Sequence, residues 1–187
     1  VSAILSLCDL RTLLESLGAR RAGTRAVRSV GCERYDPSVL GLGIDVGSTN
    51  VKVALVDDQG DLHGAASRAL ITSVDGQVAT QDPWALLDAV MGAAADVIAS
   101  HPSAATEVRS LGVCSQYSSI VGVDEACRPT TPLVMYMDQR GADHCWAIME
   151  RHPDAFEAWM AHHGIPPIGA GLSLAHLLAL QLDEPGV

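Results

Sequence analysis

The segment from Gly43 to Lys52, which reads GIDVGSTNVK, has the clearest structural pattern in the chain. On either side of its centre, apolar residues alternate with small or polar ones. This alternation predicts one strand over residues 40–47 and a second over residues 51–55. The polar residues 48–50 separate the two, so the sequence predicts a hairpin with a polar turn that follows a glycine.

The side chains of this hairpin suggest a phosphate site. Asp45 lies near the end of a strand expected to be buried, where a carboxylate is costly without a cation, and the next basic residue is Lys52. Mg²⁺, held directly or through its waters, is the natural partner. Gly47 allows a close turn, and the turn offers hydroxyl, amide and backbone N–H donors to phosphate oxygens. The predicted phosphate hairpin comprises Asp45 as metal ligand with Gly47, Ser48, Thr49, Asn50 and Lys52. On this segment alone, an ordinary hairpin without a ligand is the alternative.

Two other phosphate-binding motifs are excluded. The chain contains no G-x-x-x-x-G-K-[ST] sequence. Gly41 and Gly43 begin a G-x-G pattern, but Val46 takes the place of the third glycine, and a strand rather than a helix is predicted to follow. Neither a P-loop nor a Rossmann dinucleotide site is therefore expected.

The remaining pattern indicates an α/β protein. Asp82 before Pro83 is a typical helix start, with Asp82 as the N-cap. The predicted elements are a strand over residues 62–70, a helix over 82–100, a buried strand over 108–113, a hairpin of strands 120–123 and 133–137, and helices over 138–151, 155–163 and 173–182. Strands followed by mixed helices and strands define the α/β class.

Composition excludes several kinds of function. The 187 residues carry 22 acidic and 12 basic side chains, a net charge of −10 with a single lysine, which argues against nucleic acid as a partner. The five cysteines are widely spaced, which indicates neither a disulfide framework nor a thiolate zinc site and favours a reducing, cytoplasmic setting. No run of 18 apolar residues and no signal-like start is present, so no membrane association is expected.

Charge is divided unevenly along the chain. Residues 1–40 have a net charge of +2, which leaves −12 for residues 41–187. Apolar residues at helical spacing predict one helix ending near Gly18, after which the period is lost. We therefore expect residues 1–39 to be an N-terminal extension, helical or partly disordered, and residues 40–187 to form the body of the protein.

Several segments in order resemble the FGGY carbohydrate kinases of the actin-like ATPase superfamily, and xylulose kinases in particular. The phosphate hairpin resembles the first phosphate motif of that family. The other resembling segments are TQDP at residues 80–83, GVCSQYS at 112–118, VD and RP at 123–124 and 128–129, MYMDQR at 135–140, and GLS with LL and EP at 171–173, 177–178 and 184–185. The resemblance thus extends over residues 40–187, the whole body.

This resemblance implies a ribonuclease H-like, actin-like ATPase fold, of which the chain holds only the N-terminal domain and that incompletely. It implies ATP-dependent phosphorylation of a sugar or polyol, with ATP and Mg²⁺ as cofactors and charge neutralisation as the main catalytic device. The residues it assigns to the sugar site are Gln116, Tyr117, Ser118, Asp138 and Arg140. Taken alone, Asp138 could equally cap a helix that begins there.

Departures from the family pattern limit these expectations. Tyr117 and Ser118 stand where xylulose kinases carry Met-His, so specificity for xylulose is not carried over. His176 takes the usual lysine position and is interpreted as a surface or hydrogen-bonded side chain. The catalytic base and second domain of the family would lie downstream of Val187, so we expect no catalytic base in this chain and little activity from it alone. The alternatives are a non-catalytic nucleotide- or sugar-binding module and one half of a split kinase. Exposed apolar surface is expected to favour a homodimer or association with a C-terminal kinase half.

Overall fold

The computed structural model describes residues 39–164 and 168–183 of the chain. The predicted N-terminal extension and the Glu184-Pro185 match lie outside the described residues. The chain divides into two compact units. We call residues 39–69 with 88–115 the sheet unit and residues 70–87 with 116–183 the helical unit, and each is described by itself.

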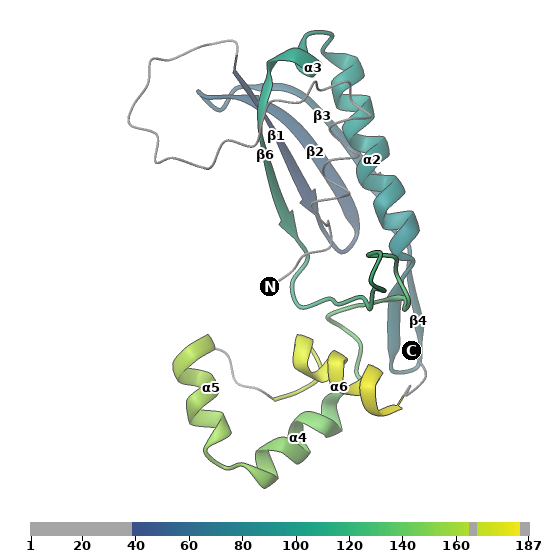
Figure 1. Cartoon of the computed structure of the whole chain (residues 1–187), viewed down its shortest axis with the longest axis vertical. Helices are drawn as coiled ribbons and strands as arrows, with labels where there is room; N and C mark the ends of the chain where they lie inside the picture. The colour runs from purple at the N-terminus through teal and green to yellow at the C-terminus, as the bar shows by residue number, and fades with distance from the viewer. Residues whose placement is uncertain (1–38, 165–167, 184–187) are drawn as a thin grey trace. The chain divides into compact units, whose positions relative to one another are not determined.

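The sheet unit is built on the predicted hairpin. It contains β1 (Leu40–Val46), β2 (Asn50–Asp57), β3 (Leu62–Ala69) and β6 (Val108–Ser115). The strand order is β3-β2-β1-β6, with the first three strands antiparallel and β6 parallel to β1 (Figure 1). These three consecutive strands confirm the predicted hairpin and the strand predicted over residues 62–70.

One face of this sheet is covered by α2 (Pro83–Ser100), whose residues from Asp88 onward belong to the sheet unit (Figure 1). Alternate residues of β1 and β2 are buried, as the two-residue period of a strand requires. The core consists of Leu40, Leu42, Ile44, Val46, Val51, Val53 and Leu55 from the sheet and Ala89, Val90, Ala93, Ala94 and Val97 from α2. Gly64 of β3 gives α2 room to approach, because a Cβ there would lie 3.1 Å from the Ser100 Oγ.

The start of α2 is as predicted. Asp82 Oδ1 accepts hydrogen bonds from the backbone N–H of Trp84 at 2.8 Å and of Ala85 at 3.4 Å, and Pro83 is the first helical residue. Among the described helices, α2 is the one long and apolar enough to cross a membrane, with a mean hydropathy of 1.2. Its buried apolar residues pack on the sheet, and 33% of this 18-residue stretch is buried.

β6 differs from the prediction of a buried strand. It pairs with β1 over its length, but its side chains are half-buried or exposed, and Val113 is 47% exposed. β6 is the last strand in the order of this sheet, and it follows the short helix α3 (Ala104–Glu107). The apolar pattern identified the strand correctly, but an edge strand buries less than a central one.

The helical unit begins with a small antiparallel sheet that the sequence did not predict. Its strands are β4 (Thr72–Asp75), β5 (Val78–Gln81) and β7 (Leu133–Val134), in the order β4-β5-β7. Gly76 makes the β4–β5 turn with a φ of 58°. The predicted strand 133–137 ends early, because the backbone turns so that Asp138 N–H bonds to the Met135 carbonyl.

Three helices complete this unit: α4 (Ala142–Arg151), α5 (Ala155–His163) and α6 (Ser173–Asp183). The last two confirm the predicted helices. The helix predicted from Asp138 instead begins at Ala142, with Gly141 as N-cap. A Cβ on Gly141 would overlap the carbonyl of Ala175, so the start of α4 and the first turn of α6 are packed backbone to backbone.

Candidate functional site

The phosphate hairpin joins β1 to β2, and its six predicted residues lie in the turn and in the ends of the two strands beside it. Asp45 is paired across the strands with Lys52. The Gly47 N–H donates to the Asn50 carbonyl at 3.1 Å, and a Cβ on Gly47 would lie 2.9 Å from that same oxygen. Glycine is thus required by the close turn, while Ser48 and Asn50 are half-buried and Thr49 is exposed.

Asp45 is not buried, which corrects the reasoning that first pointed to a cation. Its side chain is 52% exposed, and its carboxylate lies 3.8 Å from the Nζ of Lys52, itself 66% exposed. Because Ile44 and Val46 face the core, Asp45 between them must point to the opposite face of the sheet. Desolvation therefore does not demand a metal at this position.

The hairpin nevertheless has the donor chemistry of a Mg²⁺–phosphate site. Mg²⁺ keeps several waters and is usually held by one or two carboxylates together with substrate phosphates. A single exposed carboxylate beside a turn with hydroxyl side chains fits this mode. In the described ranges 39–164 and 168–183, no group of three His, Cys, Asp or Glu side chains is placed to hold a metal. A metal bound entirely by protein side chains of this region is thus not indicated.

The first sugar-site segment lies in a chain of buried polar groups within the helical unit. Gln116 donates through Nε2 to Oε1 of Gln81 at 3.3 Å and accepts through Oε1 from the Ser119 hydroxyl at 3.3 Å. Ser119 in turn accepts from the backbone N–H of Tyr136 at 3.2 Å. This chain of hydrogen bonds connects residues 116–119 to the segment that contains Asp138. Neither Gln81 nor Ser119 was predicted as a site residue, and both are buried.

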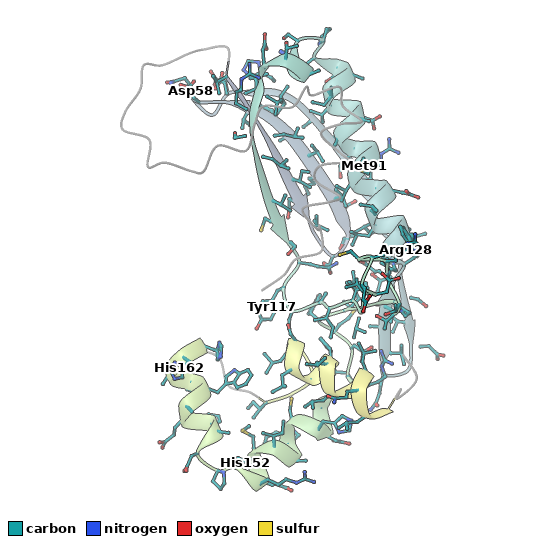
Figure 2. The ribbon with its side chains drawn as sticks, in the orientation of Figure 1. Asp58, Met91, Tyr117, Arg128, His152 and His162 are labelled. Atoms are coloured by element: carbon teal, nitrogen blue, oxygen red, sulfur yellow. The ribbon has the colours of Figure 1, made fainter. Side chains whose placement is uncertain are left out.

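The side chains of Tyr117 and Ser118 differ in exposure. Tyr117 is 58% exposed and its ring projects away from the ribbon (Figure 2). Ser118 is buried, has a φ of 58°, and its Oγ lies 3.2 Å from the Ser173 Oγ on α6. A left-handed backbone at a residue other than glycine is strained, and such strain is common at binding sites. Of these two residues, Tyr117 has the side chain available to a ligand.

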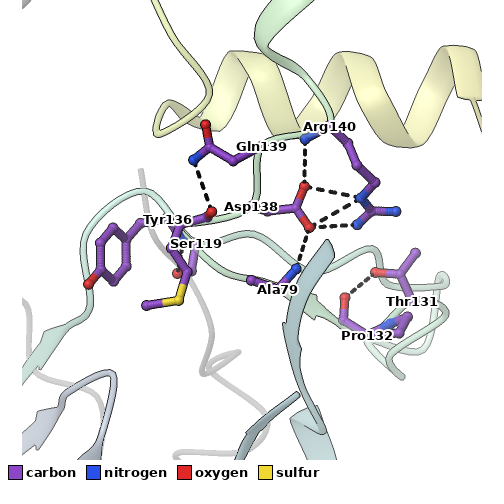
Figure 3. A network of polar contacts seen from close by, with 9 residues as sticks. Ala79, Ser119, Thr131, Pro132, Tyr136, Asp138, Gln139 and Arg140 are labelled. Carbon is purple, nitrogen blue, oxygen red and sulfur yellow. Dashed lines mark hydrogen bonds and ion pairs between the residues drawn. The ribbon is translucent and has the colours of Figure 1, made fainter. Parts of the chain in front are cut away.

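Asp138 and Arg140 form an ion pair with a buried carboxylate and a half-buried guanidinium. The Asp138 carboxylate is fully buried and accepts from Nε and Nη2 of Arg140 at 3.0 Å, from the Arg140 N–H at 3.1 Å and from the Ala79 N–H at 2.9 Å (Figure 3). Burial alone would raise the pKa of Asp138, but the hydrogen bonds from Arg140 and Ala79 together hold that pKa below its usual value. Asp138 therefore ties the turn after β7 to β5 and does not cap a helix.

The interpretation of His176 as a surface or hydrogen-bonded histidine is wrong. Its side chain is fully buried on α6, and neither ring nitrogen has a hydrogen-bond partner among the residues that the structure describes. Burial lowers the pKa of His176, so its neutral form is favoured. Its place in an apolar helical run was the one sequence signal for burial.

The predicted site residues thus form two groups. The six residues of the phosphate hairpin belong to the sheet unit, and the five sugar-site residues belong to the helical unit. Within the helical unit, the hydrogen bonds of Ser119 and Ser173 join parts of the site that are distant in sequence.

Comparison with known proteins agrees with the expected family. The model of the N-terminal domain of the FGGY family of carbohydrate kinases matches residues 40–168. A gluconokinase from Bacillus subtilis is 28% identical over 110 residues, which are 58% of this chain and 21% of the relative. A xylulose kinase from Escherichia coli is 30% identical over 118 residues, 61% of this chain and 23% of the relative. The matched region thus spans about a fifth of the length of these curated relatives.

Solved structures show the same fold. A ligand-bound xylulose kinase from Lactobacillus acidophilus has a TM-score of 0.69 at 20% identity, covering 79% of this chain and 29% of that one. A xylulose kinase from Rhodospirillum rubrum has a TM-score of 0.67 at 24% identity, covering 79% and 30%. The predicted α/β, actin-like ATPase fold is confirmed for the part of the domain that these matches cover. With its match to the family model over most of its length, the chain belongs to the FGGY family of carbohydrate kinases.

Proposed function

We propose that this chain contributes the phosphate-binding hairpin and part of the sugar site of an enzyme that phosphorylates a sugar or polyol with ATP. The observation that carries the proposal is the family match over residues 40–168, which includes both groups of predicted site residues. We assign residues 40–187 to the body of the kinase domain, residues 1–39 to an extension, and the protein to the cytoplasm.

In the proposed reaction, the hairpin positions phosphates and neutralises charge. Asp45 would hold Mg²⁺, directly or through water, and Mg²⁺ when bound would neutralise charge on the phosphate oxygens. Thr49 and Ser48 would donate hydrogen bonds from their hydroxyls, and Gly47 would keep the turn tight enough for this approach. Lys52, which lies 3.8 Å from Asp45, would add positive charge beside the phosphates.

The sugar site would use the exposed and the buried residues differently. Tyr117 and the guanidinium of Arg140 have the donors to contact hydroxyl groups of a sugar. Gln116, Ser118 and Asp138 are bonded to other protein groups and would hold the contacting residues in place. The substrate is proposed to be a sugar or sugar acid of the kinds named for the relatives, which include xylulose, gluconate and apulose kinases.

Calorimetric titration with Mg-ATP tests the hairpin. We expect Asp45→Ala in the 187-residue chain to weaken binding at least about tenfold, a loss of about 1.4 kcal/mol. Asp58→Ala is the matched control, because Asp58 is an exposed carboxylate in the turn between β2 and β3 (Figure 2). Equal affinity of Asp45→Ala and the unmodified chain would refute the assignment.

A turnover assay tests the need for residues outside this chain. We expect no sugar-dependent ATP hydrolysis or transfer above the blank when the chain is supplied with ATP, Mg²⁺ and a panel of xylulose, gluconate, apulose and glycerol. The family needs a carboxylate base and domain closure for transfer, and we place both outside this chain. Clear turnover of any of these compounds by the chain alone would contradict that placement.

A further inference from the structure

His176 is a buried imidazole without the hydrogen bonds that such a group normally has. Its side chain is fully buried, and in the described part of the chain no donor or acceptor reaches either ring nitrogen. A buried polar group without a partner is destabilising, so an unpaired group of this kind calls for an explanation. The mechanism proposed above makes no use of His176.

The ring belongs to a helix that is pressed against the Asp138–Arg140 turn. The backbone of Ala175, the residue before His176, leaves no room for a Cβ on Gly141, the residue after Arg140. Figure 3 shows the α6 ribbon passing beside the Asp138–Arg140 pair. The first turn of α6 and the ion pair are therefore immediate neighbours.

Few other charges surround the ring. From residue 173 to residue 182, α6 has no titratable side chain besides His176. On α4, which packs against α6, Cys145 is a buried thiol whose pKa is raised by burial, His144 is half-buried and Asp143 is exposed. Within residues 39–164 and 168–183, the charges that act on the His176 ring are those of Asp138 and Arg140, with opposite effects.

Asp138 has no acceptor capacity left for a second cation. Its two oxygens accept from three nitrogens of Arg140 and from the Ala79 N–H. A neutral imidazole does not need this carboxylate as a counter-charge. An imidazolium in the same fully buried place needs a counter-charge, and Asp138 is the carboxylate that acts on the ring.

We propose that His176 is a positioning residue that controls Arg140 through Asp138. When the His176 ring is neutral, the Asp138 carboxylate binds Arg140. When the ring is protonated, it competes with Arg140 for this carboxylate and weakens the contact that holds the guanidinium in place. The consequence for substrate rests on the proposed function, since it requires Arg140 to contact the sugar. His176 stands where the resemblance places a lysine, so this chain has a proton-dependent cation where the family pattern has a permanent one.

NMR observation of the Arg140 Nε–H tests this competition without any substrate. In the unmodified chain, we expect a slowly exchanging Nε–H resonance at about pH 8 that shifts or broadens as the pH falls through the titration of His176 toward about pH 5. In His176→Asn, which stays neutral, the resonance should be constant over this range. A resonance that is constant in the unmodified chain while His176 titrates would overturn the proposal.

The titration of His176 itself gives the reciprocal measurement. Arg140→Gln removes the repelling charge and frees Asp138, so we expect the pKa of His176 to rise. The exposed His162 on α5 is the control, and its ring resonances should be the same in this variant and in the unmodified chain at each pH (Figure 2). An unchanged or lowered pKa of His176 in Arg140→Gln would also refute the proposal. If this variant does not fold, the Arg140 resonance in the unmodified chain and in His176→Asn decides the question.

These readouts separate this inference from the proposed function. Both NMR results can hold when no sugar binds, in which case the proposed function fails and the control of Arg140 by His176 stands. If sugar binds but the Arg140 resonance does not change when His176 is protonated, the proposed function stands and the control of Arg140 by His176 fails. With both correct, the affinity for sugar should fall about tenfold between pH 8 and pH 5 in the unmodified chain and much less in His176→Asn.

Discussion

At the residue scale, the charge of the buried Asp138 makes the stability of the fold depend on pH. The carboxylate is fully buried, and its pKa is held below the usual value by Arg140 and Ala79 despite the opposing effect of burial. A group with a lowered pKa contributes stability that is present above its unfolded pKa of 3.8 and is lost as the pH falls through the folded value.

We therefore expect Asp138→Asn to lower the free energy of unfolding at neutral pH by about 3 kcal/mol, because it leaves the Arg140 charge without its buried partner. The loss should shrink as the pH falls below about 3.8, where Asp138 becomes protonated in the unfolded chain, and should be smallest below the lower pKa of the folded chain. Urea unfolding at a series of pH values measures this difference. Asp143→Asn, at an exposed carboxylate on α4, is the control and should change little. A pH-independent difference between Asp138→Asn and the unmodified chain would contradict the ion-pair account.

The surroundings of single side chains could be predicted only in part from the sequence. The sequence showed that Lys52 is the next basic residue after Asp45, but it could not show that the two are paired across β1 and β2 on the face of the sheet away from α2. The burial of His176 depends on α6 packing against α4, a contact between segments about 30 residues apart. Such contacts leave no periodic signal in the sequence, and this is why the polar network of Gln81 and Ser119 was missed as well.

At the scale of elements, helix starts were predicted well where a local cap exists. Asp82 before Pro83 fixed the beginning of α2 through hydrogen bonds that span only three residues. The β4–β5 hairpin was not predicted, because its strands have four residues each and little apolar alternation. Strand length and local capping, rather than overall composition, thus decided which elements the sequence could reveal.

Removal of the α2 cap should have a local and moderate cost. We expect Asp82→Ala to lower the free energy of unfolding by about 1 kcal/mol, because the N–H of Trp84 loses its acceptor. Asp88→Ala changes an exposed carboxylate within the same helix and should be nearly neutral or slightly stabilising. Thermal melts of the two variants measure the difference, and equal melting temperatures would speak against a role of Asp82 as cap.

The contact between α4 and α6 should be far more sensitive. We expect Gly141→Ala to destabilise the chain by at least about 2 kcal/mol, since the new methyl group would overlap the carbonyl of Ala175 and force the helices apart. Gly112→Ala is the matched control, because a Cβ at Gly112 meets no atom within 4 Å. Chemical denaturation of both variants tests this, and a neutral Gly141→Ala would show that the contact yields without cost.

At the scale of the whole molecule, the family and the α/β class were predictable because they depend on motifs and on their order. The GIDVGSTNVK hairpin, the Asp82 cap and the MYMDQR turn follow one another as the family pattern requires, and the family model matches residues 40–168. The division into a sheet unit and a helical unit was not predicted, since it depends on the density of contacts between segments far apart in sequence.

Exposed apolar side chains on an edge strand make self-association the expected behaviour of this chain. β6 ends the strand order of its sheet and exposes Val113. We expect sedimentation velocity to show association that increases with concentration and that Val113→Lys reduces. Val123→Lys, at a comparably exposed valine outside the named strands, should have little effect. A monomer at all concentrations would contradict the prediction of a homodimer.

The strand pairing of the phosphate hairpin has a consequence for how this segment can vary. Val51, Val53 and Leu55 face the core while Lys52 between them faces away, so the loss or gain of one residue between Gly47 and Asn50 would exchange the two faces of β2. Three valine and leucine side chains would then be moved into water and the lysine into the core. Substitutions in this turn should therefore be tolerated more readily than insertions or deletions.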